Sequence, residues 1–146
     1  MIDVEVEVLA WREALADAEA LAAASGAAAL QLAGREGDVS LLLTDDAAVR
    51  DLNARFRGKD QPTNVLSFPA PENPQGLLGD VALAFETCAR EAHEQGKTLS
   101  AHLQHLVAHG VLHLVGYEHD VDADAEIMEA LERRILAALG VADPYA

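Results

Sequence analysis

The chain begins with a stretch in which apolar and acidic residues alternate. From Ile2 to Val8, every second residue is Ile or Val, and the residues between them are Asp or Glu. A period of two places alternate side chains on opposite faces of a β-strand. The stretch therefore predicts a strand with one face in solvent. Three later apolar runs also predict strands, at residues 39–43, 64–68 and 77–85.

Two helices are expected in the first half of the chain. In an alanine-rich segment, Trp11, Leu15 and Ala22 repeat at helical spacing, which predicts a helix over residues 11–24. After the second predicted strand, the run Thr-Asp-Asp at residues 44–46 offers an N-cap for a helix that reaches about residue 56.

Three more helices are expected in the second half. The first spans residues 86–96, the second is capped by Ser100 and carries most of the histidines, and the third spans about 122–139. The apolar residues of the last helix that are expected to face inward are Ile127, Leu131 and Ile135.

The order of these elements indicates the fold class. Strands dominate the first half and helices the second, without regular alternation, which favours a two-layer α+β fold over a doubly wound sheet. We expect a mixed sheet of about four strands with packed helices. At 146 residues, the chain fits a single domain over 1–146, which can bury roughly two-thirds of its unfolded surface without a metal or a disulfide.

The charge of the chain is strongly acidic, with one basic cluster. The formal net charge is −15, which argues against indiscriminate binding to nucleic acid. Four cations nevertheless lie close together, at Arg50, Arg55, Arg57 and Lys59. Arg50 and Arg55 are interpreted as a solvated helix end, whereas Arg57 and Lys59 are candidates for binding phosphate.

The remaining composition favours a reducing compartment. The single cysteine, Cys88, cannot form an internal disulfide and is expected to be a buried packing residue rather than a nucleophile. No leader-like segment precedes the first strand, and no apolar run approaches the ~18 residues that a membrane span needs. We therefore expect a cytoplasmic protein that does not enter a membrane.

Three histidines have the spacing of a metal site. His109 and His113 are four residues apart, so on a helix both side chains point to one face. Gly116 follows where that helix would end, and His119 arrives on the returning loop. Three imidazoles without a fourth protein ligand describe an open zinc site, in which bound water has a pKa of roughly 7. The pattern favours a catalytic metal, one ion per chain.

The histidines also allow other interpretations. A single histidine on a half-buried helix is usually a hydrogen-bonded packing residue. The trio of His105, His109 and His113 fails because its outer members lie ~12 Å apart along a helix. His102 and His105 are therefore expected on the helix surface or behind the metal ligands, and His93 is expected to be solvated.

The histidine motif has the spacing of the metzincin signature HExxHxxGxxH, with one chemical difference. Gly110 stands where those proteases carry the glutamate that takes a proton from zinc-bound water. Because glycine cannot act as that base, a peptidase is disfavoured.

Three segments together resemble the YbeY family of bacterial single-strand endoribonucleases. They are residues 53–69 (NARFRGKDQPTNVLSFP), 79–81 (GDV) and 109–119 (HGVLHLVGYEH), and the resemblance extends from about residue 43 to 120. The resemblance implies a zincin-like α+β fold, zinc held by His109, His113 and His119, and Arg57 as a functional arginine beside the metal. It also implies action on ribosomal RNA, in maturation of the small-subunit 3′ end and in ribosome quality control.

One departure from the family pattern concerns the two acids beside the last histidine. The family commonly reads Gly-Tyr-Asp-His-Glu, whereas this chain has Glu118 before His119 and Asp120 after it. We interpret both carboxylates as groups that orient imidazoles or balance charge. Other candidates for lining the cleft and binding substrate are Lys59, Asn64, Ser67 and Asp80. The last three are equally well interpreted as turn or hydrogen-bonding residues that shape the cleft.

The leading hypothesis is thus a zinc-dependent endoribonuclease that cuts single-stranded RNA. Arg57 suits the charge that develops on phosphate oxygens, and the nucleophile is either water or the RNA 2′-OH. The alternatives are a zinc peptidase and a non-catalytic ribosome assembly factor with a structural metal.

Overall fold

Four strands form one mixed sheet with the order β1-β2-β4-β3 in the computed structural model, which describes residues 1–146. The strands are β1 (Ile2–Val6), β2 (Asp38–Thr44), β3 (Val65–Pro69) and β4 (Leu77–Ala84). Strands β1, β2 and β4 run parallel, and helices connect β1 to β2, whereas the short loop between β3 and β4 makes this pair antiparallel. The predicted α+β class and mixed four-stranded sheet are confirmed.

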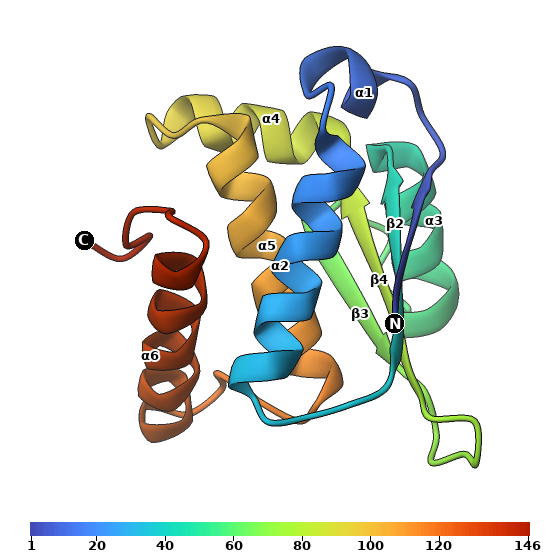
Figure 1. The fold of residues 1–146 in the computed structure, drawn as a ribbon. Coiled ribbons are helices and arrows are strands. Elements are labelled where there is room, and N and C mark those ends of the chain that lie inside the picture. The colour runs from blue at the N-terminus through green and yellow to red at the C-terminus, as the bar shows by residue number, and fades with distance from the viewer.

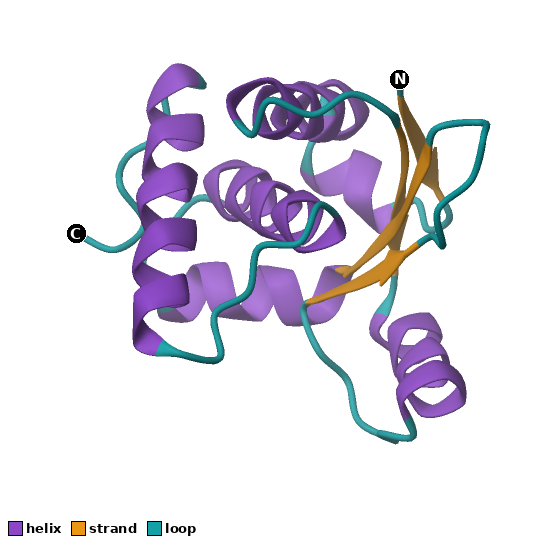
Figure 2. Ribbon diagram, turned by 90° about the horizontal axis from the view of Figure 1, so that it is seen from below, coloured by secondary structure: helices purple, strands orange, loops and turns teal.

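Six helices surround the sheet. They are α1 (Ala10–Ala14), α2 (Ala18–Leu32), α3 (Asp46–Arg57), α4 (Phe85–Glu94), α5 (Leu99–Leu114) and α6 (Asp122–Ala138). Helices α2 and α5 lie side by side on one face of the sheet, and α6 packs beyond them (Figure 1). Viewed along the sheet, α3 lies alone on the opposite face (Figure 2).

The strand patterns have the burial that their sequences predict. In β1, Ile2, Val4 and Val6 are half-buried, and the acids between them are exposed, so the predicted alternation is confirmed although the strand ends at Val6. The main core lies between the sheet and helices α2, α5 and α6, and a smaller apolar cluster lies under α3.

The alanine-rich segment forms two helices, so the single helix predicted over 11–24 is wrong. The helix breaks at Leu15, whose backbone is extended, and α2 then continues to Leu32. Trp11 explains the break, because its fully buried indole donates to the carbonyl of Thr44 and contacts the ring of Phe85 edge-on. This contact holds α1 at the end of the sheet, where α2 cannot follow in line.

Two further details of the helices differ from expectation. Helix α5 is capped by Thr98, whose hydroxyl accepts from the amide of Ala101, and not by Ser100. On α6, Leu131 and Ile135 are buried as predicted, but Ile127 is 59 % exposed. The buried face begins at the next residue, Met128, because the stripe that meets α2 and α5 is turned by one position. The predicted cap of α3 is confirmed at Asp45, whose carboxylate accepts from an amide in the first turn.

Gly110 is the point at which α5 touches the sheet. A Cβ atom there would lie 2.6 Å from Val81 Cγ1 and 3.2 Å from Ser67 Oγ. The hydroxyl of Ser67 donates to the carbonyl of Gly110 at 2.8 Å, which ties β3 to the C-terminal half of the helix. The absence of a side chain therefore lets α5 lie directly on β3 and β4.

This contact predicts opposite effects for two helical glycines. Gly110→Ala should lower the free energy of unfolding by about 1–3 kcal/mol, because the added methyl overpacks the contact with β4. Gly26→Ala in α2 is the matched control, since its Cβ would lie 3.3 Å from the nearest atoms of Ile2, a contact that needs a shift of a few tenths of an ångström by a half-buried residue near the N-terminus. It gains helix propensity of about 0.8–1.0 kcal/mol. Urea unfolding of the metal-free proteins measures both, and equal stabilisation by the two alanines would refute the packing argument.

Candidate metal centre

A polar pocket opens where α5, the edge strand β3 and two loops meet. Its volume is about 510 Å³, and its lining residues are mostly polar or charged. The lining residues are Arg57, Lys59, Thr63, Asn64, Val65, Ser67, Pro69, His109, His113, Glu118, His119 and Asp120. Residues that are up to 63 positions apart in the sequence, from Arg57 to Asp120, therefore face one cavity.

The three histidines of the motif converge in this pocket. One potential ligand atom of each lies within 4.8 Å of the others. His109 and His113 come from the last turns of α5. His119 comes from the loop after Gly116, which has φ of +101° and turns the chain back. The group could hold a metal ion, as the motif predicts.

The nitrogen atoms of this trio fit a cation. Nε2 of His109 lies 3.0 Å from Nε2 of His113. Nδ1 of His109 lies 2.6 Å from the carboxylate of Glu132, so this nitrogen carries the proton and Nε2 presents a lone pair. Two imidazole nitrogens that face each other at this distance need a proton or a metal ion between them.

The protonation of His113 also suits ligation. Burial, and then the charges of His109 and His119, lower the pKa of His113. The neutral imidazole, which is the form that binds metal, is therefore favoured. Glu118 lies 3.7 Å from Nδ1 of His113 and is largely exposed, which is compatible with its expected role of balancing charge.

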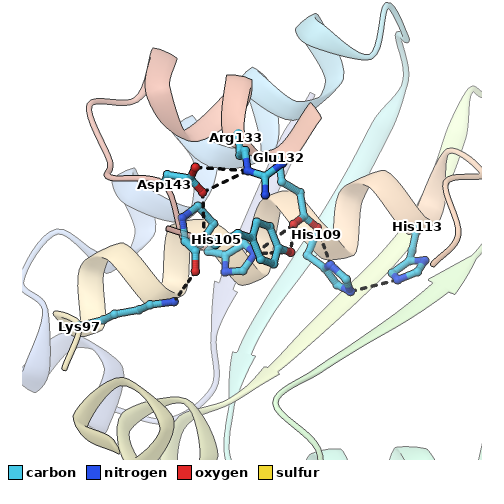
Figure 3. Close-up of polar contacts among 9 residues, drawn as sticks. Lys97, His105, His109, His113, Glu132, Arg133 and Asp143 are labelled. Carbon is cyan, nitrogen blue, oxygen red and sulfur yellow. Dashed lines mark hydrogen bonds and ion pairs between the residues drawn. The ribbon is translucent and has the colours of Figure 1, made fainter. Parts of the chain in front are cut away.

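Glu132 is the group in this region that the sequence interpretation missed. Its side chain is completely buried, and its carboxylate accepts hydrogen bonds from His105, His109 and Tyr145 (Figure 3). Burial acts to raise its pKa, but these three hydrogen bonds outweigh burial and hold the pKa at about 2. A carboxylate within the apolar stripe of α6, between Met128 and Ile135, was the available signal.

The other histidines lie in three different environments. His105 lies behind the metal ligands and forms a hydrogen bond with Glu132. This position is one of the two alternatives expected for it, the other being the helix surface. His102 is buried and bonds to Glu91, so its placement on the helix surface is wrong. His93 is exposed, as expected.

The basic cluster divides into paired and unpaired cations. Arg50 forms an ion pair with Asp60 at 2.7 Å, and Arg55 pairs with Asp51 at 3.3 Å. Arg57 and Lys59 form no ion pair and line the pocket. The loop that carries Lys59 is fixed by buried Asn53, whose amide donates to the Gln61 carbonyl at 2.9 Å.

Asn64 and Ser67 line the pocket, but their polar atoms are already engaged. The amide of Asn64 donates to Glu91 at 2.9 Å, and its oxygen accepts from the backbone of Val65. Ser67 donates to Gly110, as described above. Both side chains therefore shape the pocket by holding β3 in place.

Asp80 does not line this pocket, and the expectation that it does is wrong. Successive residues of a strand point to opposite faces, and the neighbouring Val81 contacts α5. Asp80 therefore faces the side of α3, where it borders a larger, mainly apolar cavity of about 790 Å³. That cavity contains no histidine and no arginine, so the smaller polar pocket is the candidate site.

Two further expectations concern Cys88 and membrane-spanning segments. Cys88 is fully buried, and burial raises the pKa of its thiol, so the expected packing role is supported and a thiolate nucleophile is not. No helix in the structure has both the length and the apolar character needed to span a bilayer.

Comparison with known sequences assigns the family. The family model described as endoribonuclease YbeY matches residues 4–140. The chain belongs to the YbeY family. Relatives named endoribonuclease YbeY include one from Paramagnetospirillum magneticum, 55 % identical over 99 % of this chain and 94 % of the relative. Another, from Rhodopseudomonas palustris strain HaA2, is 54 % identical over 93 % of this chain and 76 % of the relative.

The fold of this YbeY family member is also found in a solved structure. The solution structure of a protein from Thermotoga maritima superposes with a TM-score of 0.60 at 24 % identity. The match covers 96 % of this chain and 92 % of that one. It supports the arrangement of the sheet and helices described above.

The low pKa of Glu132 predicts a pH dependence of stability in the metal-free protein. Its folded pKa of about 2 is below the ordinary value of 4.5, so the stabilisation is complete above pH 4.5 and is lost as the pH falls toward 2. Glu132→Gln should cost on the order of 3 kcal/mol at pH 6 and much less at pH 3. Urea unfolding at both pH values checks this, and a difference that grows on acidification would contradict it.

Proposed function

We propose that this protein is a zinc-dependent endoribonuclease that cuts single-stranded RNA. Membership of the YbeY family supports the endoribonuclease activity. The observation that carries the proposal is that two unpaired cations, Arg57 and Lys59, share one pocket with three convergent imidazoles. We further propose that residues 1–146 act as a single hydrolase domain in the cytoplasm, on ribosomal RNA and the ribosome, in small-subunit 3′-end maturation and quality control.

His109, His113 and His119 are the proposed ligands of one zinc ion per chain. Their geometry and the lowered pKa of His113 support neutral imidazole ligands. A zinc ion held by three protein ligands supplies a Lewis acid and lowers the pKa of water. Glu132 holds the proton on Nδ1 of His109 and thereby keeps Nε2 free to bind the ion.

Arg57 is the proposed catalytic residue. Cleavage of a phosphodiester increases the negative charge on the phosphate oxygens, and a planar guanidinium can donate two parallel hydrogen bonds to them. Arg57 is the last residue of α3 and precedes Gly58, which has a left-handed backbone and ends the helix. Lys59 on the following loop is the proposed second contact to the RNA backbone.

The contact of α5 with the sheet argues against the peptidase alternative. Gly110 faces Val81 and Ser67, and no side chain fits between them. A glutamate at this position would have no space in this packing, so the general base of the metzincin proteases has no counterpart here. A purely structural metal is also disfavoured, because the trio borders an open pocket with unpaired cations.

Arg57 provides a test with a neighbouring control. Arg57→Ala should keep the metal and the fold but lower the cleavage rate roughly 100-fold, the usual loss for one donor to a developing oxyanion. Arg57→Lys should recover only part of the rate, because an ammonium lacks the planar fork. Arg55→Ala is the matched control, since Arg55 pairs with Asp51 and does not line the pocket. Cleavage rates for the four proteins decide this, and equal losses at positions 55 and 57 would refute the assignment.

The substrate class is tested with three polymers. Zinc-loaded protein should cut a single-stranded RNA, should cut the same RNA annealed to its complement much more slowly, and should leave an unfolded polypeptide intact. For single strands, the logarithm of RNA affinity falls with the logarithm of salt concentration by about 0.7 per phosphate contact. Because few cations are available to make such contacts, the total slope should be shallow.

His113→Ala controls for contaminating nuclease in this assay. Cleavage of the polypeptide but not of RNA would overturn the proposal in favour of the peptidase. Equal RNA cleavage by His113→Ala would show that the observed activity does not come from this pocket.

A further inference from the structure

The carboxylate of Glu132 is the centre of a hydrogen-bond network that ends at a metal ligand. Its Oε1 accepts from Nδ1 of His109 at 2.6 Å, and its Oε2 accepts from Nε2 of His105 at 3.1 Å and from the hydroxyl of Tyr145. The side chain of Glu132 is completely buried. Figure 3 shows His105 and Glu132 between the C-terminal segment and His109.

Tyr145 belongs to a C-terminal segment, residues 143–145, that folds back onto α6 and α5. Asp143 pairs with Arg133 at 3.2 Å and accepts from the amide of Tyr145 at 2.8 Å. The ammonium of Lys97 donates to the Pro144 carbonyl at 3.4 Å. The guanidinium of Arg133 lies 5.2 Å from the centre of the Tyr145 ring. Several independent contacts thus hold the hydroxyl of Tyr145 against the carboxylate of Glu132.

We propose that Glu132 is a positioning residue for His109 and that Tyr145 latches it in place. Docking of residues 143–145 then sets how tightly the metal is held. This inference rests on the proposed metal site, and it goes beyond the ligands to the part of the chain that orients one of them.

The position of the proton on His109 supports the first step. A neutral imidazole has one N–H, and Glu132 accepts it at Nδ1. The ring orientation and the lone pair on Nε2 are therefore fixed before a metal arrives. Hydrogen bonds of this kind to a carboxylate also make the ligand more basic, and their loss typically weakens metal binding about 10- to 100-fold.

The burial of Glu132 supports the second step. A buried carboxylate is held in place by the donors that replace its lost hydration, so each donor that is removed weakens its hold. Without the hydroxyl of Tyr145, Oε2 keeps only His105, whose ring is 5.5 Å from the tyrosine ring and packs against it. Loss of the latch would therefore loosen both groups that hold the carboxylate against His109.

His113 is supported differently from His109. The acid near His113 is Glu118, which is 3.7 Å away and 58 % exposed, so solvent screens it. The network through Glu132 is the one that joins a ligand to a distant segment, from position 109 to position 145. Because only His109 is connected to the C-terminal segment in this way, docking of that segment affects metal binding through His109.

Zinc affinity measured by competition with a chelator tests the inference. Tyr145→Phe removes the latching hydroxyl and keeps the ring on Arg133, and it should weaken zinc binding roughly tenfold. Glu132→Gln should weaken it by about 10- to 100-fold. Glu126→Gln is the matched control, because this acid lies exposed on the same helix, and zinc affinity should not change.

Thermal unfolding of the metal-free variants distinguishes positioning from packing. Positioning predicts that Tyr145→Phe lowers the metal-free Tm only by the loss of one hydrogen bond to the carboxylate, and by less than Glu132→Gln does, while the rise in Tm on adding zinc becomes smaller. Unchanged zinc affinity in Tyr145→Phe and Glu132→Gln would overturn the inference. His113→Ala separates this result from failure of the site itself, because only a wrong metal site leaves zinc affinity unchanged in that variant as well.

Discussion

The direct contact of α5 with β3 and β4 at Gly110 is the constraint on which the site depends. Successive residues of an α-helix are rotated by about 100°, so His109 and His113 lie roughly 100° and 60° from Gly110, on the same side of the helix. Because Gly110 fixes the rotation of α5 on the sheet, both imidazoles point over the edge strand β3. The loops that follow α3 and α5 then close the pocket around them. The lack of one side chain thus determines where the ligands point.

The pocket contains positively charged side chains, although the protein as a whole is strongly acidic. With a net charge of −15, the chain repels polyanions at long range, so an RNA must be held at short range by specific groups. The acids of α3 and its loop neutralise Arg50 and Arg55 and leave Arg57 and Lys59 unpaired. A metal ion at the histidines would add further positive charge to the same pocket. In the proposed function, this arrangement would favour a strand that can enter the pocket.

The sequence predicted most features that depend on local spacing, although α5 is capped by Thr98 and not by Ser100. The i,i+4 histidines, the turn at Gly116 and the cap at Asp45 are each decided within a few residues, and the structure has them as predicted. The break in the alanine-rich helix was not predictable, because it depends on the contact of Trp11 with Thr44, 33 positions away. The face of Asp80 depends on strand register, and the role of Glu132 depends on how α6 packs against α5.

The central claim is that three imidazoles of this pocket hold one metal ion per chain. Zinc K-edge X-ray absorption on the stoichiometric complex tests it most directly, together with metal content in the parent protein and in His113→Ala. The account predicts one zinc per chain with three imidazole nitrogens at roughly 2.0–2.1 Å and no sulfur ligand. Stoichiometric zinc in His113→Ala, or a sulfur ligand from Cys88, would contradict it.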